Sequence, residues 1–219
     1  MMPLQLRPAV PEDIPGMRQA YYSAFGNTVI GSRVFLTDIE ASDRFFQKSF
    51  SDEIVDPTCE LLVVTHKTSP DSKDEEVVAM IKWSLPGTPI RDPPPPEAWP
   101  AYGDLAVDFF GTLAKGHREF MGDRPHYYLE VLCTHEKWQG KGAASLLLRW
   151  GIERADAEGV PCFLEATAKG KPIYEKFGFK TKAQHEFHWP QGTSVEAYME
   201  RDAKTEKRTM TRPKTKELA

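Results

Sequence analysis

The sequence has few of the features that mark secreted, membrane-spanning or nucleic-acid-binding proteins. Its three cysteines, Cys59, Cys133 and Cys162, are odd in number and have neither metal-site nor disulfide spacing. The first residues lack the apolar core of a signal peptide, and no apolar run reaches transmembrane length. A net charge of -4 argues against the basic surface on which general nucleic-acid binding depends. We therefore expect a cytoplasmic protein with reduced thiols that binds no metal, membrane or nucleic acid.

The composition is typical of one globular domain. The chain has 219 residues, of which 40% are hydrophobic and 27% charged. We expect a single domain over residues 1–202, with an extended proline-rich insert around 86–100, because proline fixes φ and removes a hydrogen-bond donor. Residues 203–219 are polar and basic without apolar periodicity, which predicts a disordered tail; the alternative is a nuclear-import signal and therefore a nuclear location.

Hydrophobic periodicity predicts strands alternating with helices, and therefore an α/β protein with a mixed sheet. Asp13 is expected to begin the first helix as its cap. The expected strands cover 4–9, 60–67, 76–85, 127–134, 162–167, 179–187 and a last segment from 194. The expected helices cover 13–25, 38–50, 104–121, 142–158 and 170–177.

A glycine-rich turn, residues 139–144, lies between an expected strand and an expected helix. Gly140 and Gly142 let the backbone approach a ligand closely, and Lys141 adds a cation. Free backbone N–H groups at the positive end of a helix dipole form a site for phosphate. The turn therefore predicts binding of a phosphate-bearing carrier, with a tight connection that binds nothing as the alternative.

Two motifs resemble those of the GNAT superfamily of acyl-CoA-dependent N-acetyltransferases. Gln139, Gly142 and Ala144 match its Gln/Arg-x-x-Gly-x-Gly/Ala signature, and residues 173–179, IYEKFGF, match its later Leu-Tyr-x-x-x-Gly-Phe element. The order of the expected elements extends this resemblance to most of the chain, outside the proline-rich insert and the tail.

The resemblance implies a splayed, mostly antiparallel central sheet flanked by helices, with acetyl-CoA bound where the fourth and fifth strands diverge. The pyrophosphate would bind the backbone N–H groups of Gln139, Gly140, Lys141, Gly142, Ala143 and Ala144. The pantetheine arm would run along Leu132, Cys133 and Thr134. Thr167, which stands where many relatives have an asparagine that contacts the cofactor arm, would also bind the cofactor.

Three residues are candidates for catalysis: Tyr174, Glu130 and Glu165. An alkyl ammonium, with a pKa near ~10.4, must lose a proton before attack, and the departing thiolate needs a donor. In the family, the tyrosine at the position of Tyr174 commonly serves as general acid; the alternative is a packed aromatic. Strand alternation places Glu130 on the face of Tyr128 and Leu132. Glu130 and Glu165 are candidate bases, or else carboxylates paired with Arg or Lys for structural reasons.

The resemblance implies an N-acetyltransferase in which an amine attacks acetyl-CoA directly within a ternary complex. We expect a small-molecule amine as acceptor, and a monomer or homodimer. The alternatives are a protein lysine or N-terminal acetyltransferase, and a non-catalytic acyl-CoA-binding regulatory protein. The proline-rich insert and the 104–121 helix are expected to border the acceptor site, with Trp99, Tyr102 and Phe109 as an apolar wall.

Overall fold

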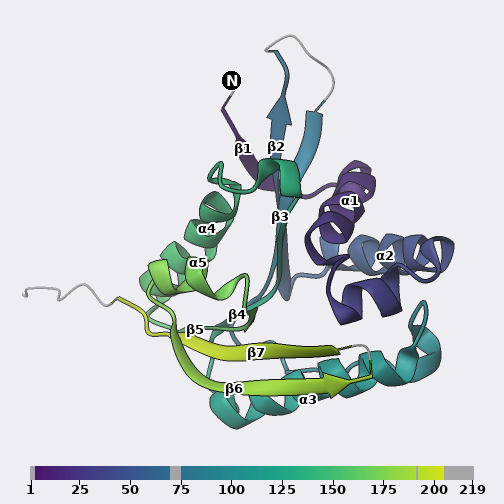
Figure 1. Ribbon diagram of the computed structural model, residues 1–219. Helices are drawn as coiled ribbons and strands as arrows, with labels where there is room; N and C mark the ends of the chain where they lie inside the picture. Colours follow the sequence, from purple (N-terminus) through teal and green to yellow (C-terminus); the bar gives the residue numbers. More distant parts are fainter. Residues whose placement is uncertain (1–2, 70–74, 191, 205–219) are drawn as a thin grey trace, which may run out of the picture.

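A seven-stranded sheet with helices on both faces forms the centre of the computed structural model, which describes residues 3–69, 75–190 and 192–204 (Figure 1). The strand order is β1-β2-β3-β4-β5-β7-β6, and every neighbouring pair is antiparallel except β4 and β5. The strands are β1 (Gln5–Pro8), β2 (Cys59–Lys67), β3 (Glu75–Ser84), β4 (Tyr127–Thr134), β5 (Cys162–Thr167), β6 (Lys180–Trp189) and β7 (Gly192–Arg201). The predicted mixed and mostly antiparallel sheet is therefore confirmed.

Five α-helices cover this sheet in the described part of the chain. They are α1 (Ile14–Phe25), α2 (Ile39–Ile54), α3 (Gly103–Met121), α4 (Ala143–Glu158) and α5 (Lys171–Lys176). In Figure 1, α1 and α2 lie on one side of β2–β4, α4 and α5 lie on the other, and α3 runs beneath β6 and β7. Each side has its own hydrophobic core. The sheet is therefore the middle layer, and its strand ends are the places where a site can open.

Close packing of α4 on the sheet depends on a small residue. A Cβ added to Gly151 would lie 2.3 Å from the indole ring of Trp83, which is fully buried in β3. Leu147, Leu148 and Ile152 bury their side chains in the same core. This contact fixes the position of α4, and therefore of the glycine turn that precedes it.

The central feature of the sheet is the early separation of β4 from β5. The two strands pair only from Tyr127 to Leu129, opposite Cys162 to Leu164. On the other edge of β4, the register with β3 shifts at Lys82 and Trp83, whose partners are Val131 and Leu129, so that Glu130 is an extra residue. The bulge and the lost pairing open a gap at the centre of the sheet.

This bulge overturns the predicted faces of β4. Leu132 packs with Leu129 on the α4 side, whereas Val131 packs with Cys133 against α1 and α2. Strict alternation had placed Leu132 with Glu130 and opposite Leu129. The prediction was wrong because one inserted residue reverses the side of every later residue.

Smaller differences concern the helix ends. Asp13 does not cap α1: its carboxylate accepts two hydrogen bonds from Arg7 (2.6 and 2.8 Å) and one from the amide of Val10. A turn of π-helix at Gly31–Phe35 and a 3-10 helix at Pro96–Ala98 were not predicted. The expected tail falls almost wholly on residues 205–219, which lie outside the described residues.

The described ranges include no helix with both the length and the apolar character needed to cross a membrane. Cys133 and Cys162 are buried thiols, as predicted, and Cys59 is partly buried. Within the same ranges, no three side chains of His, Cys, Asp or Glu come together in a way that could hold a metal ion.

Candidate active site

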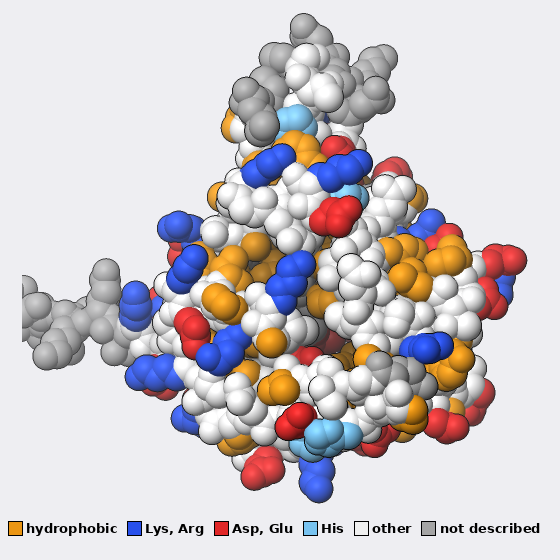
Figure 2. Space-filling view, in the orientation of Figure 1, with side chains coloured by type: hydrophobic (Ala, Val, Ile, Leu, Met, Phe, Trp, Pro, Cys, Tyr) orange, Lys and Arg blue, Asp and Glu red, His pale blue; other side chains and the backbone are white. Residues whose placement is uncertain are grey.

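A cavity of about 950 Å³ begins where β4 leaves β5 and extends toward α3 and the proline-rich segment. Among its lining residues are Glu130 of β4, Glu165 of β5 and Tyr174 of α5. In Figure 2, the surface is hollowed between the α4–α5 side and the α1–α2 side, and hydrophobic side chains gather along the hollow. The fold thus brings the three predicted catalytic residues to one cavity.

The glycine turn at the end of β4 has the backbone geometry of an anion site. Gly140 and Gly142 have φ of 75° and 92°, a region that strongly favours glycine. A Cβ at either position would meet no atom within 4 Å, so conformation rather than space requires glycine there. Among the residues that the structure describes, no side chain caps the N-terminus of α4. The first N–H groups of any α-helix have no acceptor within the helix, so those of α4 are available to a ligand.

Two side chains stabilise the turn. The Gln139 amide donates to the backbone carbonyl of Thr134 (3.1 Å), which ties the turn back to β4. The Lys141 ammonium lies 4.5 Å from the centre of the Trp138 ring, a cation–π contact. Gln139 thus has an observed structural role, and the binding role predicted for residues 139–144 stays a prediction.

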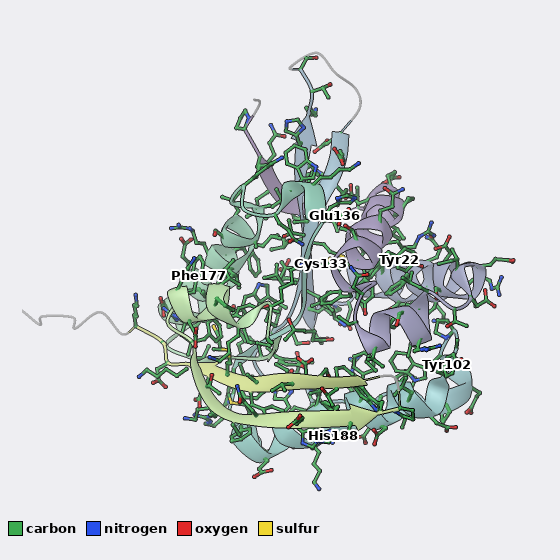
Figure 3. All side chains as sticks on the ribbon, in the orientation of Figure 1. Tyr22, Tyr102, Cys133, Glu136, Phe177 and His188 are labelled. Atoms are coloured by element: carbon green, nitrogen blue, oxygen red, sulfur yellow. The ribbon has the colours of Figure 1, made fainter. Side chains whose placement is uncertain are left out.

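The last residues of β4 have one open edge. Leu132, Cys133 and Thr134 pair with β3 on one side, and the pairing with β5 has already ended at Leu129. Leu132 lines the cavity, whereas the Cys133 side chain is buried at the middle of the molecule (Figure 3). An extended ligand arm can pair with this edge through the backbone.

Tyr174 lies on α5, where its ring packs in the core and also forms part of the cavity wall. The side chain is 7% exposed and packs against Phe179, and its hydroxyl has no hydrogen-bond partner among the described residues. Burial raises the pKa of the phenol well above its ordinary value. Tyr174 is therefore neutral near pH 7 and can donate a proton or a hydrogen bond.

Thr167 has a local role that the sequence did not predict. Its hydroxyl oxygen accepts a hydrogen bond from the amide of Gly170 (3.0 Å), just before α5. A Cβ at Gly170 would lie 3.2 Å from that oxygen and 3.3 Å from the Tyr174 ring. Thr167 therefore shapes the turn that positions Tyr174, and its predicted contact with a cofactor remains untested.

Glu130 is held by an ion pair. One carboxylate oxygen lies 2.8 Å from the Lys82 ammonium, and the other accepts a hydrogen bond from the Ser84 hydroxyl. Lys82 also contacts Glu53 at 2.9 Å. Burial lowers the pKa of Lys82, but the two carboxylates outweigh this effect and the pKa is raised overall. Glu130 was expected to be either a base or a carboxylate paired with Arg or Lys, and its observed contacts are those of the paired carboxylate.

Glu165 has no such cation within the described ranges. One carboxylate oxygen accepts a hydrogen bond from the Tyr128 hydroxyl (2.8 Å), and the other is buried without a partner. Burial raises the pKa of Glu165 to about 8, despite the hydrogen bond from Tyr128, which lowers it. A carboxyl group that titrates near neutral pH in a cavity is suited to proton transfer.

Glu196 of β7 is a third carboxylate in the cavity, and sequence reasoning missed it. Glu196 pairs in register with Thr167, and Glu165 pairs with Tyr198, so Glu165 and Glu196 are diagonal neighbours on one face of the sheet. Glu196 is 6% exposed, and burial raises its pKa to about 7. A carboxylate inside an otherwise apolar strand was the signal that could have identified it.

Two histidines of the cavity wall were also missed. The Nε2 atoms of His117 and His126 lie 2.6 Å apart, and Nδ1 of His126 lies 2.6 Å from the Arg124 carbonyl oxygen. That carbonyl can only accept, so His126 donates from Nδ1 and accepts from His117. Burial lowers the pKa of His117 to about 3 and also lowers that of His126. Both rings are thus neutral and are poor acid–base candidates.

The expected aromatic wall is present in part. Trp99 and Phe109 line the cavity, but Tyr102 does not: it is 50% exposed at the start of α3, with a φ of 46°, away from the centre of the molecule (Figure 3). The lining also includes Phe45, Phe110 and Trp189. The wall therefore comes from α2, α3, β6 and the proline-rich segment together.

Comparison with known proteins gives one family match and a set of similar folds. The family described as acetyltransferase (GNAT) domain matches residues 111–189. The fold is similar to that of a protein from Corynebacterium glutamicum described as histone acetyltransferase HPA2 and related acetyltransferase. That similarity has a TM-score of 0.59 and 21% identity, and it covers 94% of this chain and 99% of the other.

Two further solved structures share the fold. Arabidopsis thaliana NAA60, solved with a bisubstrate analogue, has a TM-score of 0.60 at 12% identity, with 93% of this chain and 100% of that chain covered. The PaiA N-acetyltransferase of Thermoplasma acidophilum, solved with coenzyme A, has a TM-score of 0.55 at 15% identity, with 92% and 99% covered. Residues 111–189 thus match the GNAT acetyltransferase domain, and the fold of the described residues is that of solved acetyltransferases.

Proposed function

We propose that this protein transfers the acetyl group of acetyl-CoA to a primary amine of a small molecule. One observation carries the proposal: a cavity at the point where β4 leaves β5 is lined both by Tyr174 and by Glu165, a carboxylate with no cationic partner in the described part of the chain. The first supplies a proton donor and the second a proton acceptor, which are the two groups that amine acetylation requires.

The binding of acetyl-CoA is part of the proposal. The uncapped start of α4, with Gly140 and Gly142, would receive the pyrophosphate, and the open edge of β4 from Leu132 to Thr134 would receive the pantetheine arm. The uncharged strand edge suits the neutral pantetheine arm of acetyl-CoA, and the turn with Lys141 suits its charged pyrophosphate. Residues 1–202 would act as one domain.

Each proton has a place in the proposed reaction. The amine nitrogen attacks the thioester carbonyl carbon, a carbon–nitrogen bond forms and the carbon–sulfur bond breaks. Glu165 accepts the proton that the neutral amine loses as the bond forms, and Tyr174 donates a proton to the departing thiolate. Exchange with water then removes the proton from Glu165 and returns one to the Tyr174 phenolate. Glu130 is not assigned the role of base, because Lys82 and Ser84 already engage both of its oxygens.

The test is thiol release from acetyl-CoA by the purified full chain with a panel of amines, together with the product mass. Tyr174→Phe is expected to lower kcat roughly 10- to 1,000-fold with little change in the Kd of acetyl-CoA, because it removes a proton donor and leaves the packing. Tyr127→Phe is the matched control. That buried tyrosine donates to Glu158 (2.7 Å) and does not line the cavity.

The possible outcomes separate the candidate functions. Equal activity of Tyr174→Phe and the parent protein would remove the acid role of Tyr174. Tight binding of acetyl-CoA without turnover of any amine would favour the regulatory protein instead. Turnover of a lysine or N-terminal peptide, but of no small amine, would favour a protein acetyltransferase.

A further inference from the structure

The cavity has two chemically different ends, which together describe an acceptor. One end holds the carboxyl groups of Glu165 and Glu196, and the other is bordered by aromatic rings from α2, α3 and the proline-rich segment. Both ends belong to one continuous space of about 950 Å³. A molecule that reaches from one end to the other must be polar at one end and apolar at the other.

The acidic end is suited to an amino group. Neither Glu165 nor Glu196 forms an ion pair within the described residues, and one Glu165 oxygen is buried with no hydrogen-bond partner. A buried oxygen without a partner is costly, so a donor that supplies one is bound favourably. An amino group carries the required N–H donors and can bear the complementary charge.

The apolar end is a stack of rings. Trp99 lies parallel to Phe110, with ring centres 5.0 Å apart, and it also stacks on Phe45 at 5.4 Å. Phe109 and Trp189 continue the wall, with their ring centres 6.0 Å apart. Phe45, Phe110, Trp99 and Trp189 are only partly buried, so apolar surface remains to be covered by a ligand.

The proline-rich segment borders this end of the cavity. Residues 88–94 line it, and Arg118 of α3 holds them by contacts with Asp92 (2.6 Å) and the carbonyl oxygen of Ile90 (3.2 Å). The Thr88 hydroxyl donates to the Thr58 carbonyl (3.0 Å) on the opposite side. These contacts hold the segment in place as one wall of the cavity, and a fixed wall favours an acceptor whose shape fits against it.

We propose that the acceptor is a primary amine with an apolar, ring-sized substituent, bound with its nitrogen at Glu165 and Glu196 and its ring against Trp99 and Phe110. The inference rests on the proposed acetyl transfer and specifies its substrate class. The ring supplies binding through apolar burial, while the amino group directs the nitrogen toward the base.

The test compares amines that share a primary amino group and differ in the rest of the molecule. Thiol release by the full chain at saturating acetyl-CoA is measured with ethylamine, hexylamine, 2-phenylethylamine, 1,4-diaminobutane and a lysine-containing peptide. Burial of the phenyl group is expected to raise kcat/KM for 2-phenylethylamine roughly 10- to 100-fold above that for ethylamine. Equal values, or a preference for the diamine or the peptide, would overturn the proposal.

Two phenylalanines of α3 form a matched pair of variants. Phe110→Leu removes a ring from the cavity wall, whereas Phe120→Leu removes one that contacts Phe163 and Tyr198 and does not line the cavity. We expect Phe110→Leu to reduce the preference for 2-phenylethylamine over ethylamine at least threefold, and Phe120→Leu to leave that ratio within twofold. An unchanged ratio in Phe110→Leu would contradict the proposed ring site.

Binding of 2-phenylethylamine to the coenzyme A-saturated protein, measured by calorimetry, separates the two proposals. If no amine releases thiol but 2-phenylethylamine binds, and binds more weakly to Phe110→Leu, acetyl transfer fails and the ring site stands. If small polar amines are acetylated and 2-phenylethylamine does not bind, the transfer stands and the substrate class is wrong.

Discussion

At the scale of single residues, two glutamates of one cavity differ because of their neighbours. Glu130 lies on a bulge whose cross-strand neighbours are Lys82 and Ser84, and both of its oxygens are engaged. Within the described residues, Glu165 accepts a hydrogen bond from the Tyr128 hydroxyl alone, and its second carboxylate oxygen is buried without a partner. Desolvation without a cation favours the protonated form of Glu165, so its affinity for a proton suits exchange with an amine.

The pH dependence of the reaction tests this difference. Because burial raises the pKa of Glu165 to about 8, the base becomes available only as the pH rises through that value, and kcat/KM should rise with it. Glu165→Gln is expected to remove the part of the rise that is centred near pH 8, and to lower kcat/KM at pH 9 roughly 100-fold or more. The remaining rise then reflects deprotonation of the amine alone.

Glu130→Gln is the matched control, since it changes a carboxylate of the same cavity. Its profile is expected to keep the step near pH 8, whatever its absolute rate. Glu196, whose pKa burial raises to about 7, is present in both variants, and His117, whose pKa is lowered to about 3, titrates outside this range. Loss of the step in Glu130→Gln but not in Glu165→Gln would reverse the two roles.

At the scale of elements, glycine is required at three positions in and next to α4, and the physical cause differs between the ends of the helix and its middle. Gly142 precedes the helix and Gly159 follows it, with φ of 92° and 71° in open space. Gly151 has ordinary helical geometry, but a Cβ added to it would lie 2.3 Å from the Trp83 ring. The ends of the helix therefore depend on backbone conformation and its middle on packing.

Alanine substitutions separate these causes by their thermodynamics. Gly151→Ala is expected to lower the free energy of unfolding by about 1–3 kcal/mol, because the methyl group overpacks a fully buried indole ring. Gly159→Ala should cost about 1 kcal/mol through the positive φ alone. Denaturant unfolding measures both, and a smaller loss for Gly151→Ala than for Gly159→Ala would contradict the close helix–sheet contact.

At the scale of the whole molecule, the cavity exists because the sheet opens at its centre. β4 pairs with β5 over three residues only, and helices on both sides then leave space where hydrogen bonding stops. Tyr174, Glu165, Glu196 and Trp99 come from four separate segments and meet only there. Binding of acetyl-CoA in this opening would join the two halves of the sheet.

The melting temperature in the presence of acetyl-CoA tests whether the ligand binds between the two halves of the sheet. A ligand at 100 times its Kd adds about 2.7 kcal/mol, which for a domain of this size raises Tm by about 5–10 °C. Gly142→Ala should reduce this increase by at least half, because a Cβ disfavours the left-handed turn that presents the amides. Gly159→Ala, with the same kind of backbone cost at the far end of α4, should keep the full increase.

Much of the fold could be predicted from local patterns. The bounds of β4 and β5 were predicted to the residue, because these strands are apolar and bounded by turn residues. The glycine turn and Tyr174 were found through motifs that are contiguous in the chain. The bulge at Glu130 was missed, because the insertion of one residue leaves no mark in an apolar strand and is set by the partner strand.

The candidate site was predictable only where its residues carried a local signal. Glu165 and Glu130 stood out as carboxylates in apolar strands, but the choice between them depends on Lys82, which lies 48 positions before Glu130 in the chain. Glu196 carried the same kind of signal in the last strand and was overlooked, whereas the His117–His126 pair has ordinary surroundings in sequence. The predictions about domain limits, the tail, oligomeric state and location are tested by none of these observations and stay predictions.

The sequence by itself determined the order of strands and helices, the glycine turn and the resemblance to the GNAT family. These depend on periodicity, φ preferences and contiguous motifs, which act over a few residues. The tertiary structure decided which carboxylate is paired with a cation, on which side Leu132 lies, and that an acidic end and an aromatic wall share one cavity. Burial and ion pairing depend on distances between segments far apart in the chain, and only the folded protein fixes those distances.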